Sequence, residues 1–286
     1  MTGPLSSLRY LFADIIGDDE EARPLLPDGL SADAASIVGA AIDRLIDYQG
    51  PSYAGLYVDR LRRFVYRREV DDAMLCEIAR LMALRMSYDD PIRIAQLKLA
   101  EAGDGDPRPG SSDEVARFRF DELVGALPAK VAEPVLDVLE RMRWTHRPVR
   151  VRFGVRSRVG IRRLKIEAAL RRWRLFSVRY AVERAWVERW LHMIDRALTK
   201  QPAAAFEIVR TATMIKGYGD PYRQGIADWH AIIDGLAKPV FDGTLILPDL
   251  AGAVAEARVA AMPDPRQAAL KRKIAEIRAR ALGAAA

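Results

Sequence analysis

The sequence predicts an all-α fold, a multi-helix array with at most one short strand pair. Apolar residues recur at helical spacing of three and four along most of the chain. A clear alternation of apolar and polar residues, the pattern of a half-buried strand, is confined to residues 148–154. Hydrophobic residues make up 50% of the 286 residues, which is enough to bury a sizeable core.

The beginning of the chain is poorly patterned. Residues 8–16 could form a short helix, but an acidic run and two prolines follow, so residues 1–29 are expected to form a loose leader. From residue 30 to residue 286 we expect a single large helical domain. The loop at residues 103–112, rich in Gly, Asp and Pro, is a possible internal break, and it is too short to establish a domain boundary.

Helix-start residues precede several apolar-periodic segments in the first half of the chain. Ser31 is expected to cap a helix that ends near residues 49–51, and Ser52 and Asp71 begin the next two. Further helices are expected over residues 92–102, 113–126 and 129–142.

The second half continues in the same way around one expected strand. Residues 148–153 are predicted to form that strand, and residues 244–247 are the candidate partner. Trp186 and Trp190 are four residues apart and are expected in the core of a long helix. Helices are expected over residues 161–173, 177–198, 202–215, 221–236, 249–260 and 264–282.

Composition excludes several kinds of site. The single cysteine, Cys76, excludes a disulfide within the chain and a cysteine-ligated iron–sulfur cluster. The three histidines are far apart and no metal-ligand spacing is present, so we expect neither metal ligands nor a catalytic residue set. The sequence shows no signal peptide and no apolar run near the ~20 residues of a membrane span, which predicts a cytoplasmic protein.

Positive charge is concentrated in one segment. Residues 141–174 contain thirteen Lys or Arg against one acid, Glu167, a net charge of +12. Because the whole chain carries +6, the remainder carries −6. Such a segment can bind nucleic acid, pair with another subunit or with acids of the same chain, or form a solvated face.

The densest chemical signal lies at residues 216–223, between two expected helices. Gly217 and Gly219 favour the positive-φ backbone of a helix end. One interpretation is an anion site in which Lys216, Tyr218 and Arg223 converge. The other is a helix corner in which Arg223 pairs with a nearby acid, since Asp220 would occupy the helix N-terminus and repel an anion.

A second helix start, at residues 87–93, resembles the first because both contain Asp-Pro-x-Arg after a Tyr. An Arg in the first helical turn faces the positive end of the helix dipole, so it needs a carboxylate or a bound anion. The candidate ligand or subunit contacts at the two corners are Tyr88, Asp89, Arg93, Lys98, Lys216, Tyr218, Asp220 and Arg223.

Four stretches, read together, resemble one family in order and approximate spacing. They are Asp47-Tyr48-Gln49 with Tyr53, Ala54, Tyr57 and Arg60; Met86-Ser87-Tyr88-Asp89-Asp90 with Ile92-Arg93-Ile94-Ala95 and Leu97-Lys98; Leu175-Phe176-Ser177-Val178-Arg179-Tyr180 with Glu183; and Ile215-Lys216-Gly217-Tyr218-Gly219-Asp220. They look like the C-terminal helical region of the beta subunit of indolepyruvate ferredoxin oxidoreductase and its relatives, over roughly residues 30–282.

The resemblance implies an oxidoreductase context. Enzymes of this kind oxidatively decarboxylate aryl pyruvates to acyl-CoA thioesters and pass electrons to ferredoxin. Thiamine diphosphate and iron–sulfur clusters belong mainly to the partner alpha subunit, so none is expected in this chain. The gamma-type domain with which the beta subunit usually begins is not found in this sequence, so we expect either an excised C-terminal region or a naturally shortened relative, and a gamma-type domain on another chain is one possible partner. The resemblance assigns no catalytic residue here.

Two functions follow. The first is a helical accessory region that supports oxidation of 2-oxoacids by an assembled complex. The alternative is a basic helical protein that binds nucleic acid or an acidic protein partner, with nucleic acid the less expected because no recognised nucleic-acid-binding motif is present.

Overall fold

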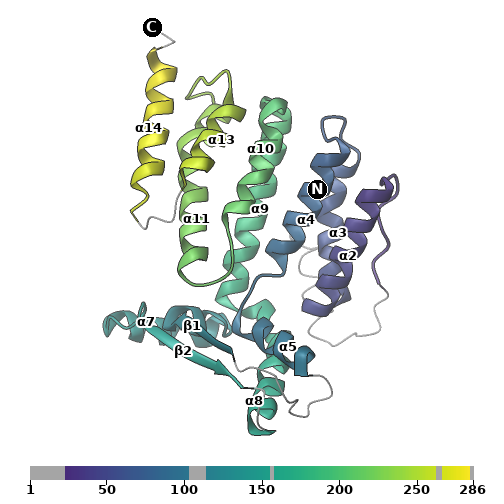
Figure 1. Cartoon of the computed structure of the whole chain (residues 1–286), viewed down its shortest axis with the longest axis vertical. Helices are drawn as coiled ribbons and strands as arrows, with labels where there is room; N and C mark the ends of the chain where they lie inside the picture. Colours follow the sequence, from purple (N-terminus) through teal and green to yellow (C-terminus); the bar gives the residue numbers. More distant parts are fainter. Residues whose placement is uncertain (1–22, 103–113, 155–157, 262–265, 284–286) are drawn as a thin grey trace. The chain divides into compact units, whose positions relative to one another are not determined.

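A computed structural model describes residues 23–102, 114–154, 158–261 and 266–283 (Figure 1). In these ranges the chain is mainly α-helical with one two-stranded antiparallel sheet, so the predicted fold class is confirmed. Residues 1–22 of the predicted leader and all of the predicted loop at 103–112 lie outside the described residues.

The chain divides into two compact units, and each is described by itself. Unit 1 comprises Met1–Leu26, Gly39–Arg60 and Met86–Ala185, and unit 2 comprises Pro27–Val38, Leu61–Arg85 and Trp186–Ala286. The expectation of one domain over residues 30–286 stays a prediction. Four of the five changes of unit fall within helices, because α2, α3, α4 and α9 contribute residues to both units.

Unit 1 combines helices with the sheet. It contains the end of α2 (Ala32–Tyr48), the start of α3 (Pro51–Val65) and the start of α9 (Val178–Lys200). Its other elements are α5 (Pro91–Ala102), β1 (Glu114–Arg119), α6 (Phe120–Gly125), α7 (Ala129–Arg141), β2 (Pro148–Phe153), α8 (Arg158–Ala169) and the 3₁₀ helix η1 (Leu170–Phe176).

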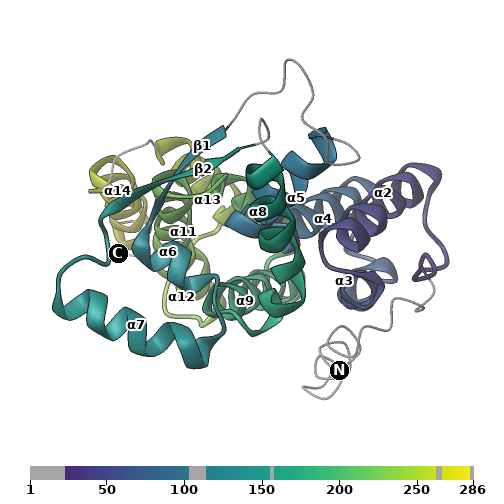
Figure 2. The ribbon, with the colours of Figure 1, turned by 90° about the horizontal axis from the view of Figure 1, so that it is seen from below.

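The sheet corrects two predictions. Residues 113–126 were expected to be helical, but β1 occupies the first half and pairs antiparallel with β2, and α6 begins only at Phe120 (Figure 2). Ala116 and Phe118 are buried whereas Val115 is 55% exposed, so the alternation of a strand is present in this stretch. The predicted partner at residues 244–247 is also wrong, because the Thr244 and Leu245 amides donate to the Pro239 carbonyl in a turn.

Unit 2 consists of helices joined by turns, with no strand among its described residues. Besides parts of α2, α3 and α9, it contains nearly all of α4 (Asp72–Met86). The predicted helix over residues 202–215 is a 3₁₀ turn, a short α-helix and a second 3₁₀ turn. The remaining elements are η2 (Pro202–Ala204), α10 (Ala205–Arg210), η3 (Thr211–Met214), α11 (Asp220–Ile232), the π-helix η4 (Ile233–Ala237), α12 (Lys238–Phe241), α13 (Leu250–Ala260) and α14 (Ala268–Gly283).

Three tryptophans form the centre of unit 2. Trp186 and Trp190 stack with ring centroids 6.0 Å apart, and Trp186 meets Trp229 edge-on at 5.1 Å. Trp229 donates its indole N–H to Thr211 Oγ1 at 3.0 Å, which satisfies a buried polar group. The predicted core position of Trp186 and Trp190 is therefore confirmed.

Short polar side chains cap several helices, and Ser31 and Asp71 do so where the sequence predicts a helix start. In unit 2, Ser31 accepts from the Ala34 amide at 3.1 Å and Asp71 from the Met74 amide at 2.7 Å. In unit 1, Ser177 accepts from the Tyr180 amide at 3.1 Å. Each bond satisfies an amide that the first helical turn leaves without a backbone acceptor.

Candidate functional site

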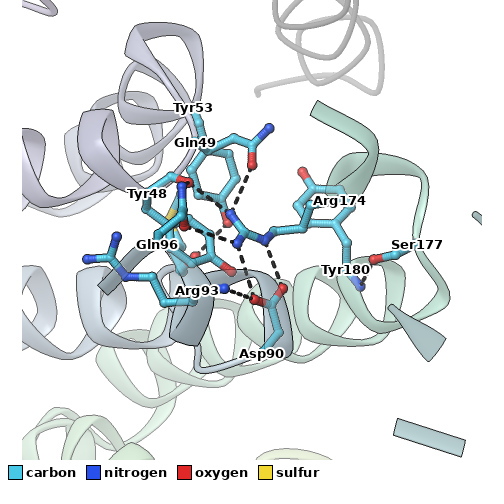
Figure 3. Close-up of polar contacts among 10 residues, drawn as sticks. Tyr48, Gln49, Tyr53, Asp90, Arg93, Gln96, Arg174, Ser177 and Tyr180 are labelled. Carbon is cyan, nitrogen blue, oxygen red and sulfur yellow. Dashed lines mark hydrogen bonds and ion pairs between the residues drawn. The ribbon is translucent and has the colours of Figure 1, made fainter. Parts of the chain in front are cut away.

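The guanidinium of Arg174 lies at the centre of a buried polar network in unit 1 (Figure 3). Arg174 comes from η1 and is 1% exposed. Its Nε and one Nη donate to the two carboxylate oxygens of Asp90 at 2.8 and 3.1 Å. This bidentate arrangement is the strongest that an Arg–carboxylate pair adopts.

The other guanidinium protons also have acceptors. Nη1 donates to the Tyr48 carbonyl at 2.8 Å and to Gln49 Oε1 at 3.2 Å, and Nη2 donates to Gln96 Oε1 at 3.4 Å. With the two bonds to Asp90, all five N–H groups of the guanidinium are used. Arg174 therefore joins the end of α2 to the start of α5, and it has no donor left for a ligand.

Asp90 has a second role at the start of α5. Its carboxylate accepts from the Arg93 amide at 2.6 Å, so it caps the helix while it neutralises Arg174. Burial disfavours the charged guanidinium, but the Asp90 charge and hydrogen bonds outweigh this penalty, so the pKa of Arg174 is raised above its ordinary value. The pair is thus a buried, fully bonded ion pair.

Tyrosines surround this ion pair. The Tyr48 ring lies under the guanidinium with 4.0 Å from its carbon to the ring centroid, and Tyr53 and Tyr88 pack on Tyr48 at 6.0 and 5.8 Å. Burial raises the pKa of Tyr48, Tyr53 and Tyr88 well above the ordinary value. These phenols stay protonated at physiological pH, so they cannot act as general bases.

Two arginines lie at the rim of the network. Arg93 donates to Asp47 at 2.6 Å, and the Asp47 side chain is 70% exposed. Arg179 lies over the Tyr88 ring at 5.6 Å and pairs with Glu183 at 2.9 Å. Arg93 thus has a carboxylate from another helix, one of the two partners that the sequence allowed.

The second corner, residues 216–223, lies in unit 2 and is built differently from the first. Gly217 and Gly219 adopt positive φ of 60° and 71°, as expected, and Gly219 rather than Asp220 is the N-cap of α11. The Asp220 side chain is 79% exposed and accepts from Arg223 at 2.7 Å. The same Asp-Pro-x-Arg sequence therefore gives a buried cap at Asp90 and an exposed ion pair at Asp220.

A close backbone approach fixes α11 against the segment before this corner. A Cβ on Gly225 would lie 2.4 Å from the Met214 carbonyl oxygen and 2.9 Å from the Ile215 Cα. Only glycine allows this contact. Lys216 follows immediately and is exposed, and Tyr218 is half-buried.

Comparison with known families places this chain. The model of a family of unknown function, DUF6537, matches residues 34–235, which include both corners and the whole Arg174 network. The chain belongs to DUF6537. No curated protein and no solved structure matches it.

Within this DUF6537 chain, the structure distributes the predicted site residues between the two units. Tyr88 and Arg93 lie in or beside the Arg174 network, Asp89 is half-buried next to Asp90, and Lys98 bonds Glu101 at 2.8 Å on α5. Lys216, Tyr218, Asp220 and Arg223 belong to unit 2.

Sequence reasoning missed the central residue of the network. Arg174 stood out only as one of thirteen basic residues in its segment, and Asp90 only as a member of one of the four stretches that carry the resemblance. One feature of the sequence could have indicated the network. Polar and aromatic residues recur in three of the four stretches that carry the family resemblance. Those three stretches, at residues 47–60, 86–98 and 175–183, contribute most of the residues in and around the network.

Two further observations concern what the described part of the chain contains. In residues 23–102, 114–154, 158–261 and 266–283, no group of three or more His, Cys, Asp or Glu side chains is placed to hold a metal ion. Among the helices described, none has the length and apolar character needed to cross a membrane.

Proposed function

We propose that this DUF6537 chain is a helical accessory region of a complex that oxidatively decarboxylates aryl 2-oxoacids. In this proposal it supports a thiamine- and iron–sulfur-containing partner subunit in the cytoplasm. Its own role is to provide a rigid scaffold rather than catalytic groups.

One observation carries the proposal. Three of the four stretches that resemble the beta subunit of indolepyruvate ferredoxin oxidoreductase converge on one buried network in unit 1. Arg174, which directly precedes the third stretch, uses all its donors there, and Asp90 of the second stretch accepts from both Arg174 and the Arg93 amide. Residues used in this way support a scaffold role, because none is left to act on a substrate.

The cofactors belong to the partner in this proposal. The chain has one cysteine, Cys76, and a cysteine-ligated cluster needs several. Burial and nearby aspartates raise the pKa of the Cys76 thiol, which disfavours the thiolate that ligates metals. These residues do not fit an iron–sulfur cluster, so the proposal routes no electron through this chain.

The test is purification of the affinity-tagged full chain from its native host at low salt. We expect recovery of a large subunit that carries thiamine diphosphate and iron, and reduction of a viologen dye by the eluate when indolepyruvate and coenzyme A are supplied. Recovery of the chain alone, or of a partner with neither cofactor, would contradict the proposal.

The second corner supplies a separate variant for the same preparation. If Lys216 and Arg223 bind a substrate carboxylate or a coenzyme A phosphate, Lys216→Ala with Arg223→Ala raises the KM of the reconstituted complex about tenfold or more. Unchanged kinetics would show that this corner serves structure only, since Arg223 already pairs with Asp220.

One observation favours the alternative, a nucleic-acid-binding protein. Arg117 and Arg150 lie directly opposite each other across β1 and β2, and both are exposed. Like charges at this position are destabilising, and a phosphate backbone would offset the repulsion. Binding of the chain to duplex DNA that weakens steeply with salt, and that Arg117→Thr with Arg150→Thr abolishes, would favour this alternative over the accessory role.

A further inference from the structure

The outward side of α8 and η1 carries a line of exposed apolar side chains. Val159, Ile166 and Trp173 occur seven residues apart and are 81%, 61% and 57% exposed. On the inward side, Ile161 and Leu164 are 3% and 1% exposed, and α8 packs on α5 within unit 1. The inward side accounts for the packing of α8, so the outward apolar line needs a different explanation.

Basic side chains lie between and beside these apolar side chains. Arg162, Arg163 and Lys165 are all exposed on α8. The single acid between residues 141 and 174 is Glu167, and it is already bonded to Arg163 at 2.7 Å. The surface formed by Val159, Arg162, Arg163, Lys165, Ile166 and Trp173, called the α8 face below, therefore combines exposed apolar and cationic side chains.

The composition of the α8 face selects among occupants. Exposed apolar side chains together with Trp and Arg are enriched in protein–protein contacts. A nucleic-acid backbone would meet the cations but leave Val159 and Ile166 in water. A second copy that packed α8 on α8 would place the Arg and Lys side chains of the two copies against each other, and like charges repel.

We propose that the α8 face binds an amphipathic helix of a partner protein whose apolar side is flanked by Asp and Glu. The heptad-like spacing of Val159 and Ile166 suits a helix laid along α8. This inference deepens the proposed function and rests on it for the existence of a protein partner.

A second set of exposed apolar side chains, on α7, does not support a partner of defined charge. Val131, Val135 and Val138 are 54%, 39% and 52% exposed, but the helix also exposes Glu133 and Asp137 as well as basic residues. A mixed rim does not specify the charge of an occupant. These α7 side chains instead supply a control surface.

The test uses two synthetic helical peptides with the same apolar residues, one flanked by Glu and the other by Lys. Fluorescence anisotropy of each labelled peptide with the purified full chain, at about physiological salt, measures affinity. We expect binding of the Glu-flanked peptide only. Arg162→Glu with Lys165→Glu, and separately Ile166→Ser, should each weaken that binding about tenfold or more, as loss of an interface hot spot does.

Matched variants control for charge and for general stickiness. Lys271→Glu with Arg272→Glu makes the same change in net charge on exposed residues of α14, and Val138→Ser removes an exposed apolar side chain from α7. Both are expected to leave the affinity unchanged. Near-UV circular dichroism shows that each variant is folded.

Several results would overturn the inference. The first two are equal binding of the two peptides and absence of binding. The third is an equal loss of affinity with the α14 or α7 control variant. The fourth is displacement of the Glu-flanked peptide by duplex DNA or anionic vesicles when little peptide is bound. The peptide assay contains no oxidoreductase subunit, so its outcome is separate from that of the proposed function. A partner subunit that still co-purifies with the Arg162→Glu, Lys165→Glu chain would refute this inference and leave the proposed function standing.

Discussion

Arg174 is the residue on which the network in unit 1 depends. Replacing it with Met leaves Asp90 buried without its bidentate partner, and removal of one member of a buried ion pair costs about 3–5 kcal/mol. We expect Arg174→Met to lower the free energy of unfolding by about that amount in urea denaturation followed by circular dichroism. Arg174→Lys should recover little, because an ammonium cannot donate to five acceptors in a plane.

A double variant distinguishes loss of the pair from loss of packing. Asp90→Asn added to Arg174→Met removes the stranded charge, so the double variant is expected to be more stable than Arg174→Met alone. Arg162→Met, at an exposed position of α8, is the matched control and should change stability by less than about 0.5 kcal/mol. Equal losses at Arg162 and Arg174 would show that the network is not important for stability.

The tyrosine hydroxyls differ in their bonding, which gives a second prediction. Among the described residues, the hydroxyls of Tyr48 and Tyr88 are buried without a hydrogen-bond partner, whereas Tyr53 donates to the Met86 carbonyl at 2.9 Å. Tyr48→Phe and Tyr88→Phe should therefore be neutral or stabilising, and Tyr53→Phe should cost about 0.5–1.5 kcal/mol. Urea denaturation measures all three. A loss above about 1 kcal/mol at Tyr48 would reveal a partner such as a bound water.

The same tyrosines make stability depend on pH in the alkaline range. Burial raises the pKa of Tyr48, Tyr53 and Tyr88 above the ordinary value of 10.0. Above pH 10.0 the unfolded chain loses tyrosine protons that the folded chain retains, so their contribution is complete below this pH and is lost as pH rises. Each tyrosine adds up to about 1.4 kcal/mol per pH unit to the slope.

Unfolding free energies of wild type and Tyr48→Phe between about pH 9 and pH 11 test this prediction. The variant is expected to lose stability less steeply, because one titrating group is absent. Comparison of the two chains cancels the titration of lysines. Parallel slopes would contradict the assignment of a raised pKa to Tyr48.

At this scale the sequence predicted types of residue better than their partners. Arg93 was expected to find a carboxylate, and it pairs with Asp47. Arg174 could not be singled out, because its burial depends on Asp90, which is 84 residues away in the chain. Nothing in the local pattern separates a buried arginine from exposed neighbours such as Arg162 and Arg163.

At the scale of elements, α11 depends on one close contact. Gly225→Ala would place a methyl group 2.4 Å from the Met214 carbonyl oxygen, and backbone atoms can move only at a cost. Overpacking of this kind costs about 1–3 kcal/mol, which exceeds the gain of about 1 kcal/mol from the helix propensity of Ala. We expect a net loss of stability, measured by thermal and urea denaturation.

Gly125→Ala is the control for this prediction. A Cβ on Gly125, the last residue of α6, meets nothing within 4 Å. That substitution should be neutral or stabilising by up to about 1 kcal/mol. A neutral Gly225→Ala would mean that α11 can shift away from Met214 without penalty.

Helices were predicted more accurately than strands, for a physical reason. A helix start is a local event, and Ser31, Asp71 and Ser177 cap their helices within three residues. Strand pairing is not local. Leu245 and Leu247 are each 7% exposed and Ile246 is 73% exposed, which is the alternation of a strand, yet the backbone there turns back to Pro239.

At the scale of the whole molecule, neither unit is a continuous segment. A fragment that begins at Trp186 lacks residues 27–38 and 61–85 of unit 2. It therefore lacks Arg85, whose guanidinium lies 5.5 Å from the ring centroids of Trp186 and Tyr222, and Arg63, which pairs with Glu188. We expect the fragment to lose the near-UV circular dichroism of the packed tryptophans.

A nicked full chain is the control. A protease site introduced at residues 103–112 cuts the backbone but leaves every segment of unit 2 in the preparation. The nicked chain should keep the near-UV spectrum if its parts remain associated. A fragment from Trp186 onward with the full-chain tryptophan spectrum would show that unit 2 folds without its N-terminal segments.

The division into units could not be predicted from the sequence, because linkers are the usual signal of a boundary. Here four of the five changes of unit fall inside α2, α3, α4 and α9, where the sequence shows no linker. Residues 103–112, the loop that the sequence predicts, belong to a single segment of unit 1, Met86–Ala185.

The pairing of Asp90 with Arg174 also implies an order of folding during synthesis on the ribosome. Asp90 emerges 84 residues before the guanidinium that neutralises it, so the start of α5 is made well ahead of its counter-charge. Until then the carboxylate is more stable in water than buried, which keeps the tyrosines around it from closing. We therefore expect the first third of the chain to complete its folding only after its middle third has been synthesised.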